Sequence, residues 1–277
     1  MLFYITASSG TPLSVTTISN GNYLTGYTTT FRFECRTNGS YSVTLPAAIS
    51  GDVELGSSGS PGLSSGNDPI FNCPSACAIT GNLKIDYSGY QNAATYNAKV
   101  NVASATNELQ VTGNVTIGTR GYCAAQIKIT NGDLTNNGTI ASNKLTMFSN
   151  TAGIYNGNVG SSCTLVDLLI DGIGLTSKVA MTGSATLTGT YTITDAFVSL
   201  GNADITTCVN IAVTGASKCS ANQHLFVMSG RGTINDSSTE TRDVAGISSF
   251  AGCISLGAIK MSTGTTGIVG SVIVDSI

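Results

Sequence analysis

The stretch KITNGDLTNNGTIASNKLTM (residues 128–147) contains the pattern that dominates this chain of 277 residues. Short runs of alternating apolar and polar residues, KIT, GTI and KLTM, are separated by the pairs Asn131-Gly132 and Asn137-Gly138. Alternation with a period of two predicts strands with one buried face, and Asn-Gly favours tight turns between strands. We therefore interpret the stretch as short strands and turns and not as a site.

The same alternation continues along the chain, whereas apolar residues at helical spacing do not persist over a dozen positions anywhere. The predicted strands are TTTFRFECR (28–36), YSVTL (41–45), NLKIDY (82–87), AKVNV (98–102), LQVTGNVTIG (109–118), QIKIT (126–130), ATLTGTYTITDAFVSL (185–200), CVNIAVTG (208–215) and HLFVM (224–228). An all-β fold follows. We expect an antiparallel β-sandwich or jelly roll, which explains alternation and frequent turns without a fixed repeat.

A β-solenoid-like central segment is the alternative. A Thr-Gly pair follows an apolar residue in VTGNVTIG (111–118), MTGSATLTG (181–189) and VTGASK (213–218), but spacings of 70 and 32 residues do not make a period. In the alternation of short strands with turns, residues 110–215 resemble β-solenoid adhesins, whose turns are rich in Asn, Gly and Thr. The resemblance implies stacked strands in this part of the chain.

One segment predicts a domain boundary. Residues 56–69, GSSGSPGLSSGNDP, are rich in Gly, Ser and Pro and show no apolar period. Such a composition is typical of a linker, which would separate an N-terminal β unit (1–55) from a larger β domain (70–277). A long surface loop is the alternative.

The charge pattern excludes one class of protein. Only 10% of the residues are charged, 41% are hydrophobic, and the formal net charge is −3. The 12 Lys and Arg residues are scattered singly, so no basic stripe is available to neutralise a nucleic acid.

The most apolar internal stretch, TLVDLLIDGIGL (164–175), is too short to span a membrane and contains two Asp residues. So few charges give little protection against self-association.

The cysteines predict disulfides. They are dispersed, no CxxC pair occurs, and His224 is the one histidine, so we expect no metal and no cofactor. Free buried thiols are the alternative. The disulfide candidates are Cys35, Cys73, Cys77, Cys123, Cys163, Cys208, Cys219 and Cys253. Candidates for N-glycosylation are the sequons at Asn38, Asn114, Asn137 and Asn235.

We find no catalytic constellation in the sequence. A nucleophile activated by imidazole would have to use His224, and no G-x-S-x-G motif is present. Glycan hydrolysis needs two carboxylates that flank the scissile bond. Asp167 and Asp171 lie too far apart along a strand for such a pair, whereas Asp195 and Asp204 flank a turn and could meet across it. We expect that the protein is not an enzyme.

Two apolar segments suggest assembly. MLFYIT (1–6) and GIVGSVIVDSI (267–277) are apolar on consecutive residues, which is typical of strands buried on both faces. Each packs within its own domain or is donated to the open sheet edge of a neighbouring subunit. The residues concerned are Leu2, Phe3, Tyr4, Ile5, Ile268, Val269, Val272, Ile273 and Val274.

The sequence thus predicts a non-enzymatic structural subunit of an extracellular or virion-surface filament, fibre or coat. Its partners would be copies of itself, held together by β-strand contacts, with no nucleic acid and no membrane span. An adhesin that binds surface glycans through Asn, Thr and Tyr side chains is the alternative. A polysaccharide hydrolase or lyase is the third interpretation.

Overall fold

The computed structural model describes the backbone of residues 1–7, 13–14, 29–35, 42–57, 68–73, 76–87, 96–102, 107–201, 204–220, 225–228, 234–238, 243–245, 249–250, 259–261 and 267–269. Side chains are described for those residues up to 217, except 6, 7, 13, 14 and 102. These residues form strands joined by turns and loops. The part of the chain so described contains no helix long and apolar enough to cross a membrane.

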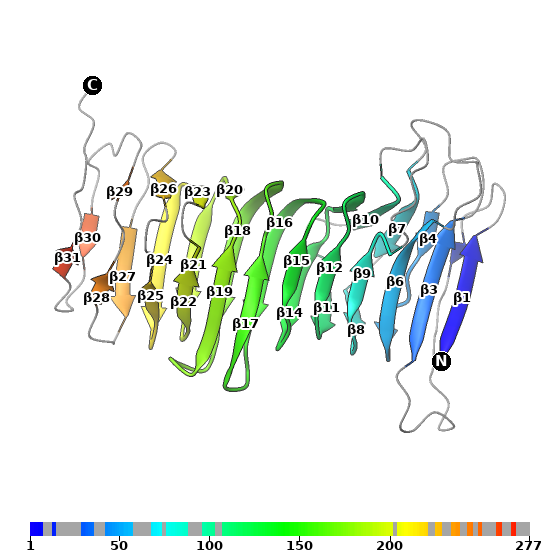
Figure 1. The fold of residues 1–277 in the computed structure, drawn as a ribbon, viewed down its shortest axis with the longest axis horizontal. Helices are drawn as coiled ribbons and strands as arrows, with labels where there is room; N and C mark the ends of the chain where they lie inside the picture. The colour runs from blue at the N-terminus through cyan, green and yellow to red at the C-terminus, as the bar shows by residue number, and fades with distance from the viewer. Residues whose placement is uncertain are drawn as a thin grey trace. The chain divides into compact units, whose positions relative to one another are not determined.

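The chain forms two compact units, residues 1–129 with 134–143, and residues 130–133 with 144–277. In the first unit the chain winds in coils, and its described strands fall into three rows. Row 1 contains β1 (Leu2–Ala7), β3 (Thr30–Cys35), β6 (Asp52–Ser57), β9 (Leu83–Ile85), β12 (Val115–Ile117) and β15 (Leu134–Asn136). Each of the four coils that begin with β3, β6, β9 and β12 contributes one strand to each row. Figure 1 shows these strands side by side, and their arrows all point the same way.

The other two rows of this unit complete the coils. Row 2 contains β2 (Leu13–Ser14), β4 (Ser42–Thr44), β7 (Ile70–Cys73), β10 (Ala98–Val102), β13 (Gly121–Cys123) and the beginning of β16 (Thr139–Phe148). Row 3 contains β5 (Ala48–Ile49), β8 (Cys77–Ile79), β11 (Glu108–Thr112) and β14 (Gln126–Thr130).

The second unit is built in the same way. One row contains β17 (Gly153–Asn158), β19 (Ser177–Thr182), β22 (Phe197–Leu200) and β25 (Lys218–Ser220). The long strand β18 (Cys163–Asp171) begins two further rows, one with β20 (Ala185–Leu187), β23 (Ile205–Cys208), β26 (Leu225–Met228) and β29 (Ser249–Phe250), the other with β21 (Thr190–Thr194), β24 (Asn210–Gly215), β27 (Ile234–Ser238) and β30 (Ile259–Met261). β28 (Asp243–Ala245) pairs with β31 (Gly267–Val269).

The expected antiparallel sandwich or jelly roll is wrong, because the strands of the described residues pair in parallel. The paired residues belong to successive coils, from 17 positions apart (Tyr122 with Thr139) to 32 positions apart (Leu109 with Cys77). The alternative placed a solenoid only over 110–215, whereas parallel stacking begins at β1 and β3.

The alternation favoured antiparallel strands because parallel sheets usually have both faces covered, and the sequences of their strands are then continuous apolar runs. In these coils most strands are buried on their inner face only, so they alternate as antiparallel ones do. β14 has the pattern half-buried, buried, half-buried, buried, half-buried. Alternation therefore identifies the buried face of a strand but not its partner.

The Asn-Gly pairs are also not hairpin turns. Asn131, with φ 54°, forms the corner between β14 and β15, two strands of different rows. Asn137-Gly138 lies at the next corner, between β15 and β16. Asn156-Gly157 lies inside β17. Asn20-Gly21 and Asn38-Gly39 lie outside the described residues.

The core consists of columns of inward side chains, one from each coil. In row 1 the parallel register aligns residues that are 0–4% exposed, namely Phe31, Val53, Leu83, Val115 and Leu134. Row 2 aligns Val43, Phe71, Val100, Cys123 and Ile140, each 0% exposed. Burying a large apolar side chain stabilises a fold by about 1.5–3 kcal/mol, so these columns hold successive coils together.

The boundary expected at 56–69 stays a prediction, because residues 58–67 lie outside the described part. Strands on either side of it are direct neighbours: β6 pairs with β9, with Val53 opposite Leu83. Both strands belong to the first compact unit.

Candidate functional site

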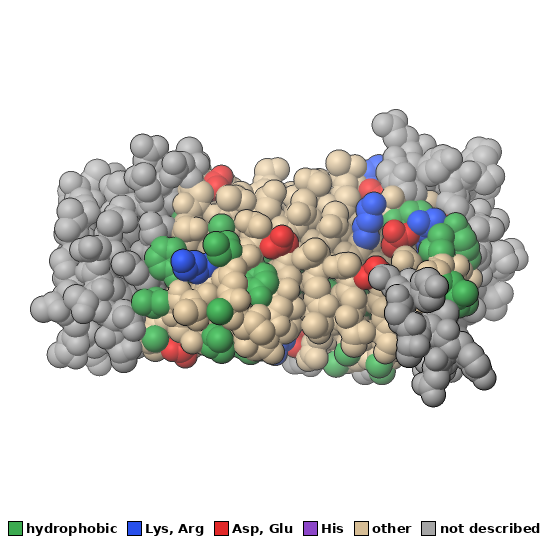
Figure 2. Space-filling view, turned by 60° about the horizontal axis from the view of Figure 1, so that its bottom comes forward, with side chains coloured by type: hydrophobic (Ala, Val, Ile, Leu, Met, Phe, Trp, Pro, Cys, Tyr) green, Lys and Arg blue, Asp and Glu red, His purple; other side chains and the backbone are tan. Residues whose placement is uncertain are grey.

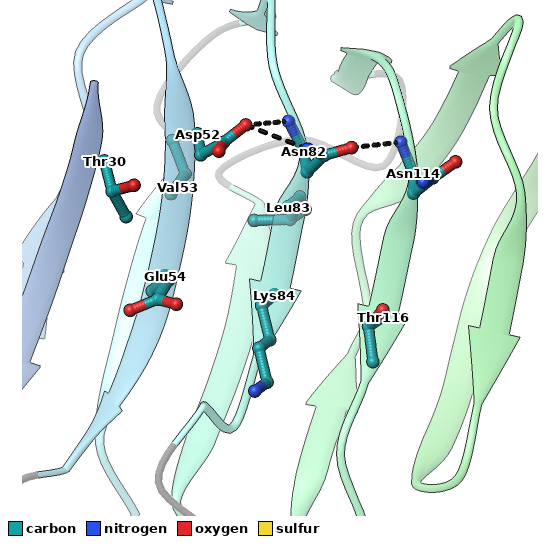
Figure 3. Close-up of a pocket in the computed structure, with 9 residues that line it drawn as sticks. All are labelled: Thr30, Asp52, Val53, Glu54, Asn82, Leu83, Lys84, Asn114 and Thr116. Carbon is teal, nitrogen blue, oxygen red and sulfur yellow. Dashed lines mark hydrogen bonds between the residues drawn. The ribbon is translucent and has the colours of Figure 1, made fainter. Parts of the chain in front are cut away.

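A row of Asp and Asn side chains crosses row 1 of the first unit, at the corners that precede its strands (Figure 3). Asp52 Oδ1 accepts hydrogen bonds from the backbone N–H of Asn82 at 2.8 Å and from its Nδ2 at 3.0 Å. Asn82 Oδ1 in turn accepts the backbone N–H of Asn114 at 2.9 Å. Each side chain therefore binds the corner of the next coil.

A sequence motif places these residues. The segments ISGDVEL (49–55), ITGNLKI (79–85) and VTGNVTI (111–117) share the pattern apolar, Ser or Thr, Gly, Asp or Asn, apolar, any residue, apolar. The register pairs Ile49 with Ile79, and Ile79 with Val111. Of the three segments, only 111–117 was identified from the sequence, where it was compared with 181–189 and 213–218, and those three do not recur at an equal spacing.

The glycine of the motif is required by the stacking of the corners. A Cβ on Gly81 would lie 2.5 Å from the backbone carbon and oxygen of Gly51. A Cβ on Gly113, whose φ is 145°, would lie 2.8 Å from the backbone oxygen of Gly81. Side chains cannot be accommodated at these distances, so successive coils meet backbone to backbone at this corner.

Three of the four carboxylates that were considered for catalysis make the same kind of contact between coils, whereas Asp171 Oδ1 accepts the N–H of the adjacent Gly172 at 2.9 Å. Asp167 Oδ1 accepts the N–H of Thr190 at 2.8 Å, and Asp195 Oδ1 accepts the N–H of Ala216 at 2.7 Å. Asp204 Oδ2 accepts the N–H of Gly183 at 2.9 Å, so Asp195 and Asp204 bind different corners. A carboxylate that accepts a backbone N–H satisfies a donor that the turn leaves unpaired. These side chains connect coils.

Asp86, another carboxylate at a corner, is more buried than these three, at 3% exposure, and has a φ of 64°. Its Oδ1 accepts Asn97 Nδ2 and its Oδ2 accepts the backbone N–H of Arg120, both at 3.0 Å. Both oxygens are thus occupied within the protein. We assign Asp86 a structural role at its corner.

A charged and aromatic cluster lies on the outer face of row 1, beside the Asp-Asn row. The register aligns Tyr4, Arg32 and Glu54 on β1, β3 and β6. Arg32 Nε donates to Glu54 Oε2 at 2.7 Å, and Arg32 Nη2 donates to the same oxygen. The Arg32 guanidinium lies 4.2 Å from the ring centroid of Tyr87 and 5.3 Å from that of Tyr4. Arg32 therefore neutralises Glu54 and packs against two aromatic rings.

Tyr87 links this cluster to a buried acid. Its hydroxyl is hydrogen-bonded to Glu34 Oε1, and Glu34 is 2% exposed. Burial raises the pKa of Tyr87, and the hydrogen bond and negative charge of Glu34 raise it further. Tyr87 therefore stays protonated at ordinary pH, and its hydroxyl can donate to the Glu34 carboxylate.

Next to this cluster, a hollow of about 240 Å³ crosses β3, β6, β9 and β12 on the outer face of row 1 (Figure 3). We call it the row 1 hollow. Its polar lining residues are Thr30, Asp52, Glu54, Asn82, Lys84, Asn114 and Thr116, and the inward-pointing Val53 and Leu83 complete it. Figure 2 shows a face dominated by uncharged groups, where acidic and basic side chains lie next to each other at the right, over elements of the first unit.

The cysteines whose side chains are described are buried free thiols: Cys35, Cys73, Cys77, Cys123, Cys163 and Cys208. They occupy inward positions in the apolar columns, as Cys123 does between Val100 and Ile140. Disulfide formation stays a prediction, and the side chains of Cys219 and Cys253 lie outside the described part. Burial raises the pKa of Cys123 to about 12.

The thiols of Cys73, at the end of β7, and Cys77, at the beginning of β8, lie next to each other. Cys77 Sγ donates to the Pro46 carbonyl oxygen at 3.1 Å. Hydrogen bonding to Cys77 and burial both raise the pKa of Cys73, so this thiol stays protonated. A protonated thiol is a poor nucleophile, and the pair is placed for packing in the core.

Two glycosylation candidates have described side chains, and both are exposed. Asn137 lies at the corner between β15 and β16, and Asn114 lines the row 1 hollow. The Asn235 backbone lies in β27 and its side chain is not described, and Asn38 lies outside the described residues.

The assembly candidates fall into two groups. Leu2, Phe3, Tyr4 and Ile5 lie in β1, which pairs with β3. Ile268 and Val269 lie in β31, which pairs with β28 of the same chain. Val272, Ile273 and Val274 lie outside the described residues.

Chemically, the row 1 hollow presents hydrogen-bond donors and acceptors, but its acids are engaged by Asn82 and Arg32. Within the described residues, no group of three or more His, Cys, Asp or Glu side chains is arranged to hold a metal ion. His224 lies outside the described residues. Comparison with family models, with curated proteins and with solved structures finds no match for this chain.

Proposed function

We propose that the protein is a non-enzymatic structural subunit of an extracellular or virion-surface filament, fibre or coat. In this proposal it self-associates through β-strand contacts at the edge formed by β1. The observation that carries the proposal is the exposure of Phe3, which belongs to a core column and is nevertheless 40% exposed.

Phe3 lies opposite Phe31 in the register, and the two rings stack with centroids 5.5 Å apart and 16° between their planes. Phe31 is only 4% exposed. Phe3 is thus covered by the next coil on one face only. Its neighbours in β1 are also exposed, Leu2 at 41% and Tyr4 at 53%, as is Met1, which precedes the strand, at 62%.

Two physical arguments support self-association here. An edge strand presents unpaired backbone N–H and C=O groups, and natural proteins usually protect such edges with charges or a covering segment. β1, LFYITA, contains no charged residue. A strand from a second copy would extend both the backbone ladder and the Phe3 column. In the proposed contact the second copy pairs with β1 through the opposite edge of its own stack, so the contact is head-to-tail and forms an open polymer unless the rotation between copies closes a ring.

The test compares two lysine substitutions at exposed apolar residues. Phe3→Lys places a charge in the proposed contact, whereas Ile154→Lys is the control at a residue of β17 that is 69% exposed. Sedimentation velocity over a range of concentrations, with electron microscopy of negatively stained samples, measures assembly. Thermal unfolding followed by circular dichroism checks that both variants are folded.

We expect the unmodified protein and Ile154→Lys to form the same polymers, and Phe3→Lys to sediment as a monomer. Polymers of Phe3→Lys that match those of the unmodified protein would contradict the proposed contact. An unmodified protein that stays monomeric at every concentration would contradict the proposed function.

A further inference from the structure

The row 1 hollow holds polar groups that the protein itself does not use. Among the described residues, the Thr30 hydroxyl, the Lys84 ammonium and the Thr116 hydroxyl make no hydrogen bond or ion pair. All three line the hollow, and Lys84 is exposed. By contrast, the nearby Asp52 and Asn82 are engaged in the contacts between corners. The hollow thus contains polar groups that are held by contacts within the protein and polar groups that make no such contact.

The register aligns two of the unused groups, Lys84 and Thr116, with Glu54, whereas Thr30 lies opposite Asp52. Glu54 lies opposite Lys84, and Lys84 lies opposite Thr116, on three successive strands. Neighbouring strands are about 4.8 Å apart, so the hollow extends for roughly 14 Å from β3 to β12. An extended ligand laid across the strands would meet a polar side chain at every coil.

The charges in and beside the hollow nearly balance. Glu54 is neutralised by Arg32. Lys84 belongs to β9, which pairs with β6, the strand that contains Asp52. A polyanion would meet the carboxylates of Asp52 and Glu54, and a polycation would meet Lys84 and Arg32. An uncharged ligand avoids both repulsions.

The chemistry of the lining fits hydroxyl groups. A hydroxyl both donates and accepts, so it can donate to a carboxylate or amide oxygen and accept from an ammonium or amide N–H. Carboxylate, amide, ammonium and hydroxyl side chains all line this hollow. Tyr4, which is 53% exposed, precedes Arg32 and Glu54 in the same outer line and offers an aromatic face for the apolar face of a sugar ring.

We propose that the row 1 hollow is a binding site for an uncharged oligosaccharide, which lies across β3, β6, β9 and β12. Lys84, Thr30 and Thr116 bind its hydroxyls, and the Asp52-Asn82-Asn114 row fixes the spacing of the coils beneath it. The binding is non-covalent and requires no reaction. It goes beyond the proposed structural role and does not depend on assembly.

The experiment uses the full chain and immobilised neutral oligosaccharides of several linkages, namely cello-, malto-, xylo- and manno-oligosaccharides. Heparin fragments and chitosan oligomers provide the anionic and cationic comparisons. Binding is measured by biolayer interferometry. Lys84→Ala and Thr116→Val remove unused groups, so neither should disturb the fold. Their matched controls are Lys178→Ala and Thr186→Val, at exposed residues of β19 and β20.

We expect at least one neutral series to bind, and Lys84→Ala to weaken its binding about tenfold through the loss of a hydrogen bond to a charged group. The control variants should bind as the unmodified protein does. Binding of charged oligomers alone would overturn the proposal, as would the absence of any binding or equal affinities for Lys84→Ala and Lys178→Ala. Repeating the assay with Phe3→Lys separates this proposal from the assembly proposal, because the hollow should bind sugar in a monomer.

Discussion

Replacing Gly81 by alanine tests the parallel stacking of coils directly. Gly81 stacks on the Gly51 corner, which precedes it by 30 positions in the chain. The added Cβ would lie 2.5 Å from the Gly51 backbone carbon and oxygen, and 2.6 Å from Asp52 Oδ1. Neither backbone atom can rotate away, so the two corners must separate.

The expected loss of stability follows from this geometry. Overpacking a well-packed site costs about 1–3 kcal/mol. Separation of the corners also weakens two hydrogen bonds, from Asn82 N and Nδ2 to Asp52 Oδ1, each contributing about 1 kcal/mol. Alanine restricts the unfolded chain, which returns about 0.4–1 kcal/mol. Gly81→Ala should therefore lower the free energy of unfolding by about 2–4 kcal/mol.

The assay is urea unfolding of the full chain, followed by far-ultraviolet circular dichroism. Gly153→Ala is the control, because its Cβ would meet the Tyr155 hydroxyl at 3.0 Å, which is the far end of a flexible side chain. The reasoning is refuted if Gly81→Ala unfolds within about 0.5 kcal/mol of the unmodified protein, the range of ordinary surface substitutions. It is equally refuted if the two variants lose the same stability.

Two further predictions concern the thiols and the glycosylation candidates. Burial raises the pKa of four thiols from 9.0 to about 12, those of Cys35, Cys123, Cys163 and Cys208. The unfolded chain loses these protons first, so stability should fall as the pH rises from 9 towards 12, by about 1 kcal/mol per pH unit for each thiol. Cys123→Ala should reduce that slope in urea titrations at successive pH values; a slope that is unchanged, together with no free thiol in the unfolded unreduced protein, would indicate disulfides. Expressed in a eukaryotic secretory host, the protein should carry a glycan at exposed Asn137, so that Asn137→Gln removes one enzyme-sensitive glycan from its mass; an unchanged mass would contradict this.

The positions of some strands could be predicted from the sequence, but their partners could not. The runs 109–118 and 185–200 were predicted as continuous strands, whereas the first contains β11 and β12 and the second contains β20, β21 and β22. β10 and β14 begin and end where alternation predicts, at 98–102 and 126–130. Alternation is local, because it depends only on which side chains face inward. Pairing depends on the length of each coil, and the distance between paired residues changes from 32 positions at Leu109 to 17 at Tyr122. No fixed period is therefore present to be found.

The candidate site was likewise predictable only in part from the sequence. Three copies of the Gly-Asp/Asn motif were visible in the sequence, and the equivalence of Asp52, Asn82 and Asn114 follows once they are aligned. The pairing of Arg32 with Glu54 has no comparable signal, because it depends on the register between β3 and β6. The cysteines were ambiguous for a different reason. A small apolar side chain and half of a disulfide favour the same buried positions.

The variable length of the coils has a consequence for how this protein can change. Successive coils are joined by parallel strand pairing, by inward side chains and by the corner contacts, so a segment that takes part in none of these carries little of the stability. Closing a longer loop costs only about 0.6 kcal/mol for each doubling of its length. The longer coils of the first unit, in which paired residues are up to 32 positions apart, are therefore natural places to insert a peptide tag or a foreign epitope, away from the stacked Gly-Asp/Asn corners. A series of grafts of increasing length there would display added sequence on a scaffold whose stacking stays the same.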